Sequence, residues 1–247
     1  MYRILREAKL QTRRGPARAP AKKTAPPSHC AEAPNRVWSW DITYLRSNVR
    51  GCFFYLYMCV DVFSRKIVGW SVEDREEAIL AEPMLCTAFK HEHVQPQTLV
   101  LHSDNGAPMK ASTLLATLRS LGIAQSFSRP HVSDDNPFSE ALFRTLKYRP
   151  EYPQTPFDSV DEARAWVEQF VDWYNHEHLH SALRFVSPAA RHARRDPAIL
   201  AARQRVYQAA HLRTPSRWSR STRNWTPRGP VYLNPGLSLS KQLDVVS

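Results

Sequence analysis

Residues 98–106 read TLVLHSDNG, and this stretch decides the expected fold. Its first four residues are apolar or β-branched, which is typical of a short buried strand. The strand leads to Asp104, and the Asn105-Gly106 pair behind it is a strong turn signal. We therefore expect Asp104 at the carboxyl end of a strand, where α/β sheets place their ligands.

Three further strands are predicted ahead of this stretch, with short turns between them. They cover residues 37–45, 53–62 and 67–72. Successive strands joined by short turns form an antiparallel meander. Alternation along the first strand places Ser39, Asp41 and Thr43 on one face. Asp41 is the second carboxylate of interest.

Helices and one more strand follow the meander. The spacing of apolar residues predicts helices over 76–90, over 110–121, and from a capping box at Ser159 to Tyr174, with a fifth strand over 123–127. Because Pro83 is unfavourable inside a helix, the first of these helices is expected to begin near Glu82. This order predicts an α/β, ribonuclease-H-like fold, with a mixed five-stranded sheet flanked by helices and with basic N- and C-terminal extensions.

A third carboxylate lies on a separate helix. Asn136 and Pro137 are an expected N-cap and first helical residue, and the helix should run to about Arg149. Glu140 lies about one turn into it, with 35 residues between Asp104 and Glu140. Arg144 and Lys147 share its face, at 3.6 residues per turn.

The composition excludes several classes of protein. With 247 residues, one or two domains are expected, and no apolar run is long enough to span a membrane. Basic residues at the N-terminus precede no apolar segment, so a secretory signal is excluded. The four cysteines show no Cys-x-x-Cys spacing, so they are interpreted as reduced thiols in a cytoplasmic protein. Cys52, Cys59 and Cys86 are expected in the core.

Charge is distributed unevenly along the chain, whose total is +11. Residues 1–30 carry net +7 and residues 185–247 carry net +9, while residues 31–184 carry net −5. Basic arms suit a polyphosphate backbone, with solubilising tails as the simpler alternative. Residues 1–10 resemble the end of a helix, residues 11–36 a flexible basic linker, and residues 215–247 either a small β element or a loose tail.

The three carboxylates together suit metal-dependent phosphodiester chemistry. Two hard cations about 3.5–4 Å apart can bridge an attacking oxygen, a phosphate and a leaving oxygen, and Mg²⁺ prefers carboxylate oxygens. Taken singly, each acid has a simpler explanation: a solvated helix face for Glu140, a strand cap for Asp41 and an Asx-turn for Asp104. Their joint order and spacing favour one shared site.

Other titratable residues are expected to be structural. Asp61 is interpreted as a structural acid that pairs with Arg65. The alternate spacing of His176, His178 and His180 does not converge on one ion, so core or DNA-facing histidines are favoured over a zinc site. Trp218 and Trp225, which lie among arginines, are candidates for core packing or for stacking on DNA.

Several motifs together resemble the integrase core of bacterial insertion-sequence transposases, relatives of retroviral integrases. The motifs are Trp38-Ser-Trp-Asp41-Ile-Thr, His102-Ser-Asp104-Asn-Gly106, Asn136-x₃-Glu140-x₂-Phe143-x₂-Leu146-Lys147 and Phe170-x₂-Trp173-Tyr174-Asn175-x₄-His180-Ser181-x-Leu183-x₃-Ser187-Pro188. The resemblance implies that Asp41, Asp104 and Glu140 hold two Mg²⁺ ions, or Mn²⁺, in a DDE site. It further implies that Lys147, Arg144 and Asn136 contact DNA.

The implied activity is cleavage of double-stranded DNA at transposon ends and strand transfer into target DNA, by a homo-oligomer. The expected domains are a basic linker over 1–33, the integrase core over 34–192 and a basic extension over 193–247. A helix-turn-helix region usually precedes such a core, so a protein from an upstream reading frame is an expected partner. His178-Leu179-His180 stands where the family more often has Arg-Pro-His.

Two other functions are compatible with the same features. One is a catalytically unproductive DNA-binding remnant, which the three intact acids disfavour. The other is a ribonuclease-H-like nuclease that only cuts, which the tail motif after Glu140 disfavours.

Overall fold

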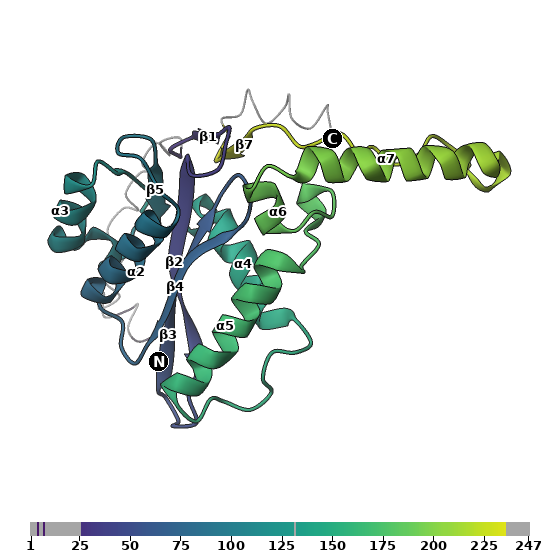
Figure 1. Ribbon diagram of the computed structural model, residues 1–247. Helices are drawn as coiled ribbons and strands as arrows, with labels where there is room; N and C mark the ends of the chain where they lie inside the picture. The colour runs from purple at the N-terminus through teal and green to yellow at the C-terminus, as the bar shows by residue number, and fades with distance from the viewer. Residues whose placement is uncertain (1–3, 5–6, 8–25, 131, 236–247) are drawn as a thin grey trace.

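A computed structural model describes residues 26–130 and 132–235, together with Ile4 and Glu7. Apart from Ile4 and Glu7, the predicted helix end over residues 1–10 lies outside the described residues, as do most of the predicted linker and residues 236–247. Figure 1 shows a twisted sheet with helices around it and one long helix that extends away from it.

The central sheet has five strands in the order β4-β3-β2-β5-β6. Their bounds are Val37–Arg46 (β2), Phe53–Asp61 (β3), Ile67–Glu73 (β4), Val100–Ser103 (β5) and Ala124–Phe127 (β6). The pairs β2–β3 and β3–β4 are antiparallel, while β2–β5 and β5–β6 are parallel. The predicted meander and the predicted mixed five-stranded sheet are confirmed.

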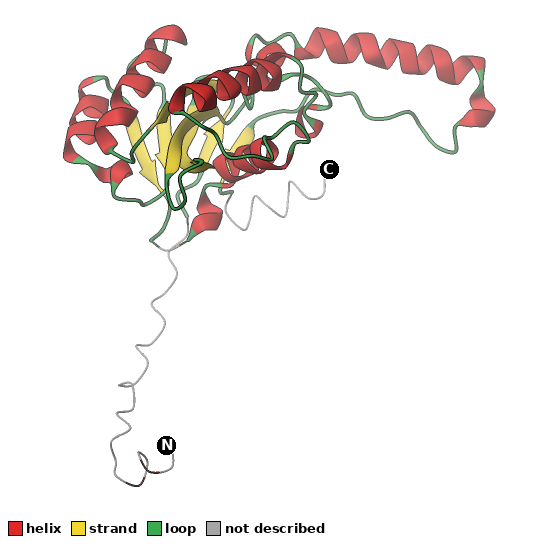
Figure 2. Cartoon of the chain, turned by 90° about the horizontal axis from the view of Figure 1, so that it is seen from below, coloured by secondary structure: helices red, strands yellow, loops and turns green. Residues whose placement is uncertain are grey.

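Helices cover both faces of this sheet (Figure 2). On one face α2 (Ala78–His91) and α3 (Ser112–Ser120) pack on the even-numbered tryptophans Trp38 and Trp40 of β2. On the other face α4 (Pro137–Tyr148) and α5 (Val160–His176) pack on Leu56 and Met58 of β3. Two apolar layers therefore enclose the sheet, as expected of a ribonuclease-H-like α/β fold.

The start of α2 differs from the prediction. The helix begins at Ala78 and contains Pro83, rather than beginning near Glu82. The loss of one backbone hydrogen bond at Pro83 is offset by burial of Ala81, Met84 and Leu85 against the sheet. Close approach of the helix also requires Gly69 on β4, where a Cβ would lie 2.9 Å from the Ala88 Cβ.

The helix ends follow the expected capping pattern in part. Ser159 caps α5, and its hydroxyl accepts a hydrogen bond from the Glu162 amide at 3.1 Å. Gly122 ends the segment after α3 with a φ of +70°. Asn136 precedes α4 as expected, but its side chain makes no capping hydrogen bond.

The two ends of the described chain meet in a second, two-stranded sheet. β1 (His29–Ala31) pairs antiparallel with β7 (Val231–Leu233). Residues 29–31 were expected in the flexible linker, and the structure corrects this, because their pairing partner lies about 200 residues away and leaves no local signal. The alternative of a small β element after residue 215 is confirmed at β7.

Between α5 and β7 the chain forms α6 (Pro188–His192) and the long α7 (Asp196–Arg213). The sequence did not predict α7, because its apolar residues are not gathered on one face. Four short 3₁₀ turns complete the described elements: η1 (Pro108–Lys110), η2 (Ser133–Asp135), η3 (Ser181–Leu183) and η4 (Pro215–Arg217).

The cysteines are all free thiols, as expected. Cys59 is buried in the core and Cys86 is partly buried. Cys52, expected in the core, is exposed because it lies in the β2–β3 turn. Among the described residues, no helix has the length and apolar content needed to cross a bilayer.

Candidate active site

Two of the predicted carboxylates lie side by side where β5 ends beside the middle of β2. β2 and β5 are parallel neighbours, and Trp40 is the register partner of Ser103. Asp41 and Asp104 are each the next residue along the chain. Since paired strands lie about 4.8 Å apart, the register brings these two carboxylates together.

Helix α4 lies across the same face of β2 and is fixed on both sides of Asp41. Ser39 Oγ lies 2.7 Å from Ser139 Oγ, and it also donates a hydrogen bond to Asn136 Oδ1. Further along, Lys147 Nζ donates to Thr43 Oγ1 at 2.7 Å. Ser39 and Thr43 flank Asp41 on one strand face, so the helix presents Glu140 on the side of the two aspartates.

Burial raises the pKa of all three carboxylates, and the charges of neighbouring acids add to this effect. Burial, then the charges of Asp104 and Glu140, raise the pKa of Asp41 to about 7, against a lowering contribution from the Ile42 amide. Burial also raises the pKa of Asp104, although hydrogen bonds from Ser128 and Asn136 oppose this. Burial and then nearby acids, including Asp104, raise the pKa of Glu140. Each group is in a setting that disfavours its charge.

Asp41 and Asp104 open into a cleft of about 430 Å³ whose lining is rich in polar groups. Asn105 also lines it, and the buried Asn105 Oδ1 has no hydrogen-bond partner in the described part of the chain. Two repelling carboxylates and an unpaired carbonyl oxygen form a donor set that suits a hard divalent cation. The residues present therefore fit the expected metal.

Glu140 does not line this cleft in the conformation described. Its side chain is exposed, and across residues 26–130 and 132–235 no three acidic, histidine or cysteine side chains converge closely enough to chelate one ion. An exposed glutamate on the first turn of a helix can change rotamer at low cost. The backbone of α4 places Glu140 over the same face of β2 as Asp41. The rotamer of its side chain decides whether the carboxylate reaches the cleft.

A buried network supports the loop that precedes α4. His102 lies between Ser126 Oγ, 3.0 Å from Nδ1, and the Asp135 carbonyl, 3.0 Å from Nε2. Burial lowers the pKa of His102 to about 4, so the ring is neutral. The Arg129 guanidinium donates two hydrogen bonds to the Asp135 carboxylate, from Nε and Nη2, each at 2.8 Å.

The terminal β1–β7 sheet also contacts this loop. His29 Nε2 lies 2.8 Å from Ser126 Oγ, and Asn234 Nδ2 donates to the Asp135 carbonyl at 2.7 Å. Sequence reasoning missed these residues, because neither His29 nor Asn234 lies near a motif. Only the position of His102 inside the motif of residues 102–106 was a usable signal.

The three predicted DNA contacts have different surroundings. Lys147 and Arg144 are exposed on α4, and Lys147 is held by Thr43. Asn136 is fully buried and bonded to Ser39 and, at 3.4 Å, to the Trp40 carbonyl. The structure thus differs from the expected DNA contact for Asn136, since its amide is already used inside the protein.

Asp61 is structural, but its partners are not those expected. The carboxylate accepts from the Asn35 and Ser64 amides at 2.8 and 2.7 Å and from the Ser64 hydroxyl at 2.6 Å. Arg65 instead donates to the Val62 carbonyl and lies 4.0 Å above the Phe138 ring. The predicted Asp61–Arg65 pair is therefore wrong.

The histidines after α5 pack on aromatic rings. His178 stacks on Tyr174 with ring centroids 5.3 Å apart, and His180 meets His178 edge-on at 5.6 Å. Burial lowers the pKa of His180 to about 4. These contacts favour the packing interpretation over metal binding.

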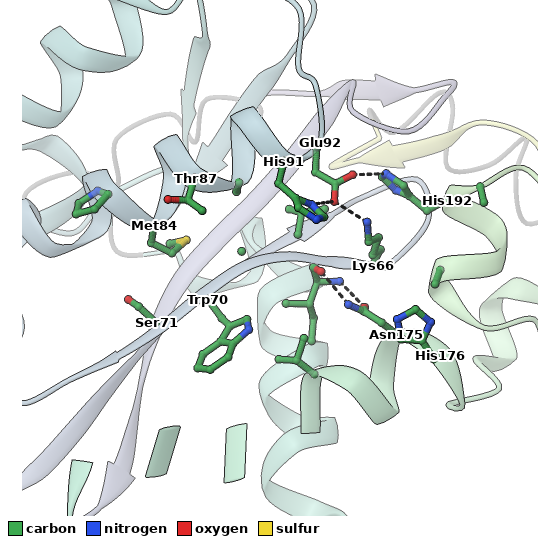
Figure 3. Close-up of a pocket in the computed structure, with 18 of the residues that line it drawn as sticks. Lys66, Trp70, Ser71, Met84, Thr87, His91, Glu92, Asn175, His176 and His192 are labelled. Atoms are coloured by element: carbon green, nitrogen blue, oxygen red, sulfur yellow. Dashed lines mark hydrogen bonds and ion pairs between the residues drawn. The ribbon is translucent and has the colours of Figure 1, made fainter. Parts of the chain in front are cut away.

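A larger pocket of about 790 Å³ lies elsewhere, along the edge strand β4 between α2 and α5 (Figure 3). At one end Glu92 accepts hydrogen bonds from Lys66 Nζ at 2.5 Å and contacts His192 Nε2 at 2.8 Å. Asn175 bonds both the amide and the carbonyl of Ile67. None of the three predicted carboxylates lines it, so the smaller cleft is the better candidate for the active site.

Comparisons with known families agree with the geometry. The profile described as Integrase core domain matches residues 31–133, and a second profile with the same description matches residues 121–188. All three predicted carboxylates lie inside the matched region.

Curated bacterial proteins are similar over the same region. The transposase for insertion sequence element IS904 of Lactococcus lactis is 36% identical over 159 residues, which is 64% of this chain and 61% of that protein. The putative transposase InsK for IS150 of Escherichia coli is 32% identical over 162 residues, covering 64% of this chain and 54% of that protein. The chain therefore spans between half and two thirds of the length of these relatives.

A solved structure shows the same fold. A chain of the simian T-cell lymphotropic virus intasome, in complex with PP2A regulatory subunit B56 gamma, superposes with a TM-score of 0.55 at 19% identity. The superposition covers 70% of this chain and 60% of that chain.

Proposed function

The chain belongs to the integrase core family through residues 31–188, and from this premise we propose that it is a DDE transposase that cleaves DNA and transfers the strand. The observation that supports this most directly is the register of β2 and β5, which sets Asp41 beside Asp104. Helix α4 carries Glu140 over the same face of β2, and we propose that a change of rotamer brings its exposed side chain to the two aspartates.

Asp41, Asp104 and Glu140 would hold the metal, with the Asn105 carbonyl oxygen available beside them. Bound Mg²⁺ or Mn²⁺, as two ions, would neutralise these carboxylates, lower the pKa of the attacking hydroxyl and stabilise the leaving oxygen. The raised pKa of each acid supports this, because a site that disfavours three negative charges gains from a cation.

The other side chains of the site position these groups. Ser128 Oγ donates to Asp104 Oδ1 at 3.0 Å, which helps to fix the orientation of this carboxylate. Asn136 holds the start of α4 against β2, so we propose a positioning role for it. Lys147 and Arg144 present exposed cations on α4 and would contact DNA phosphates near the cleft.

The reaction needs no energy source. In the first step water attacks a phosphodiester, its P–O bond forms and the bond to the 3′-oxygen breaks, which leaves a 3′-hydroxyl. In the second step that hydroxyl attacks a phosphodiester of target DNA, so one P–O bond again replaces another. We propose that the protein acts as a homo-oligomer on double-stranded DNA, at transposon ends and target, in the bacterial cytoplasm.

The test is cleavage and joining of labelled duplexes taken from the ends of the flanking DNA element. Reactions contain Mg²⁺, Mn²⁺ or a chelator, and compare the wild type with Glu140→Gln and with Glu168→Gln, an exposed glutamate on α5. We expect metal-dependent nicked and joined products from the wild type and Glu168→Gln, and none from Glu140→Gln, while all three proteins bind DNA.

Other outcomes would contradict parts of the proposal. Nicks without joined strands would indicate a ribonuclease-H-like nuclease. DNA binding without any product would indicate a remnant, unless a helix-turn-helix protein from an upstream frame restores the products. Products from Glu140→Gln would overturn the assignment of Glu140.

A further inference from the structure

Four arginines gather where α7 leaves the body of the protein. Arg203 on α7 donates through Nη1 to the Arg184 carbonyl at 2.9 Å. The guanidinium carbon of Arg203 lies 5.6 Å from the centroid of the Trp225 ring, and that of Arg223 lies 5.7 Å from the same centroid. Arg223 also lies 5.0 Å from the Phe185 ring. Arg228 is close enough for its charge to act on Arg184. We call Arg184, Arg203, Arg223 and Arg228 the arginine cluster.

The positive charge of the arginine cluster is not compensated. Among the residues that the structure describes, no acid forms an ion pair with any of the four. Asp196, at the start of α7, is taken by the buried Arg191 at 2.8 Å. Burial, followed by the charges of Arg228 and Arg223, lowers the pKa of Arg184. The charges of Arg223 and Arg228 therefore act on Arg184.

Two hydrogen-bond donors in the cluster also lack acceptors. Arg184 Nε and the indole Nε1 of Trp225 are buried and have no hydrogen-bond partner in the described ranges. Trp225 is only 6% exposed. A buried donor without an acceptor is costly, so unpaired donors beside uncompensated cations indicate an anionic ligand that supplies oxygen acceptors.

We propose that the arginine cluster binds the phosphodiester backbone of duplex DNA. Guanidinium groups bind phosphate oxygens in a bidentate way, and those that lie over aromatic rings keep their N–H edges free to do so. Arg203, Arg223 and Arg228 lie beyond the matched integrase core, whose profile ends at residue 188. None of the four arginines lines the cleft of Asp41 and Asp104, so the cluster is a separate site, and it would hold DNA without reading its sequence.

This proposal rests on the proposed function only in taking DNA as the partner. The chain's own layout supports a long ligand, because α7 has 18 residues and extends away from the sheet (Figure 1). A duplex bound at the base of α7 can continue along the exposed Arg205 and Arg213 of that helix. A small anion would use only the cluster itself.

The experiment measures equilibrium binding of a fluorescent duplex of arbitrary sequence to the full chain, in chelator and over a range of salt concentrations. The test variant combines Arg223→Gln with Arg228→Gln, both exposed side chains. The matched control combines Arg50→Gln with Arg119→Gln, which removes the same charge from exposed positions on other elements. Thermal unfolding checks that both variants fold.

We expect the test variant to lower the slope of log affinity against log salt by about 2, and to weaken binding roughly tenfold to hundredfold near 0.1 M salt. The control should keep the wild-type slope. Equal losses in the two variants would overturn the proposal, since they would reflect net charge alone. A second variant, Arg203→Gln, should lower the slope by about 1, and an unchanged slope there would also contradict the site.

Further arms separate the sources of phosphate and the two proposals. If the cluster bound duplex RNA more tightly than duplex DNA, RNA would be the ligand instead of DNA. If millimolar inorganic phosphate abolished the cluster-dependent binding, free phosphate would be the ligand. If the wild type yields joined products but the test variant keeps the full slope of log affinity against log salt, the arginine-cluster proposal alone is overturned. If the wild type yields no products but the test variant has a lower salt slope, the proposed function alone is overturned.

Discussion

Ser39 Oγ lies 2.7 Å from Ser139 Oγ, and this contact between β2 and α4 sets the position of Glu140 relative to Asp41. Glu140 is one residue from this contact on α4, and Asp41 is two residues from it on β2. The two hydroxyls are buried, so water cannot readily replace either partner, and loss of this hydrogen bond would cost free energy of folding. The site is therefore only as well ordered as the polar contact beneath it.

Replacing Asn136 with alanine should destabilise the protein and reduce its activity. The change removes the acceptor of the Ser39 hydroxyl and the donor to the Trp40 carbonyl, and leaves both groups buried. We expect a loss of about 1–3 kcal/mol in the free energy of unfolding, measured with urea. Asn48→Ala, at an exposed loop contact, should change it by less than about 0.5 kcal/mol. Equal stability of the two variants would contradict a supporting role for Asn136.

Replacing Asp41 with asparagine should stabilise the metal-free protein while it abolishes strand transfer. At pH 8 the variant no longer holds a carboxylate that burial and Asp104 disfavour, yet asparagine can still accept from the Ile42 amide. We expect a gain of about 1–3 kcal/mol in chelator. Added Mg²⁺ should raise the Tm of the wild type but not of Asp41→Asn. Asp172→Asn, on the exposed face of α5, is the control, and a loss of stability in Asp41→Asn would count against the repulsion argument.

Replacing Lys147 with glutamine should affect DNA more than folding. Its ammonium is held by Thr43 Oγ1 beside the cleft, so it is the better ordered of the two cations on this helix face. We expect the free energy of unfolding to fall by no more than about 1 kcal/mol, for the lost hydrogen bond to Thr43, while the salt slope of DNA binding falls by about 1 and joining slows. Lys90→Gln, an exposed lysine on α2, should leave both unchanged. Normal joining by Lys147→Gln would exclude a contact to the reacting DNA.

His192 should make stability depend on pH above 6.5, the ordinary pKa of a histidine. Burial alone would lower the pKa of His192, but interactions with Asp61 and Glu92 reverse this and raise it above 6.5, against a smaller opposing effect of Lys66. A raised folded-state pKa stabilises the fold below pH 6.5, and that stability is lost as the pH rises through the folded-state value. Thermal unfolding from pH 6 to 9 should show a falling Tm in the wild type. The fall should be smaller in His192→Gln, and an equal fall in both would mean that another group titrates.

Much of the fold could be predicted because its signals are local. Alternation defined β2, and the apolar run of residues 53–62 defined β3, since side-chain period and burial are set within each strand. The turn signal after Asp104 placed that acid at a strand end. Pro83 misled the prediction of where α2 begins, because packing against Gly69 and its neighbours outweighed a local preference.

The sequence by itself determined the succession of the central strands along the chain and the helix that carries Glu140, and it singled out three acids as the predicted site, because these follow from patterns within one element or from recognisable motifs. Only the tertiary structure decided that β1 pairs with β7, that Asn136 points inward to Ser39, and that Arg203 and Arg223 lie over Trp225 with Arg203 bonded to the Arg184 carbonyl. The physical reason is the same in each case: these contacts join residues that are distant in sequence, and their energy exists only once the chain has brought them together.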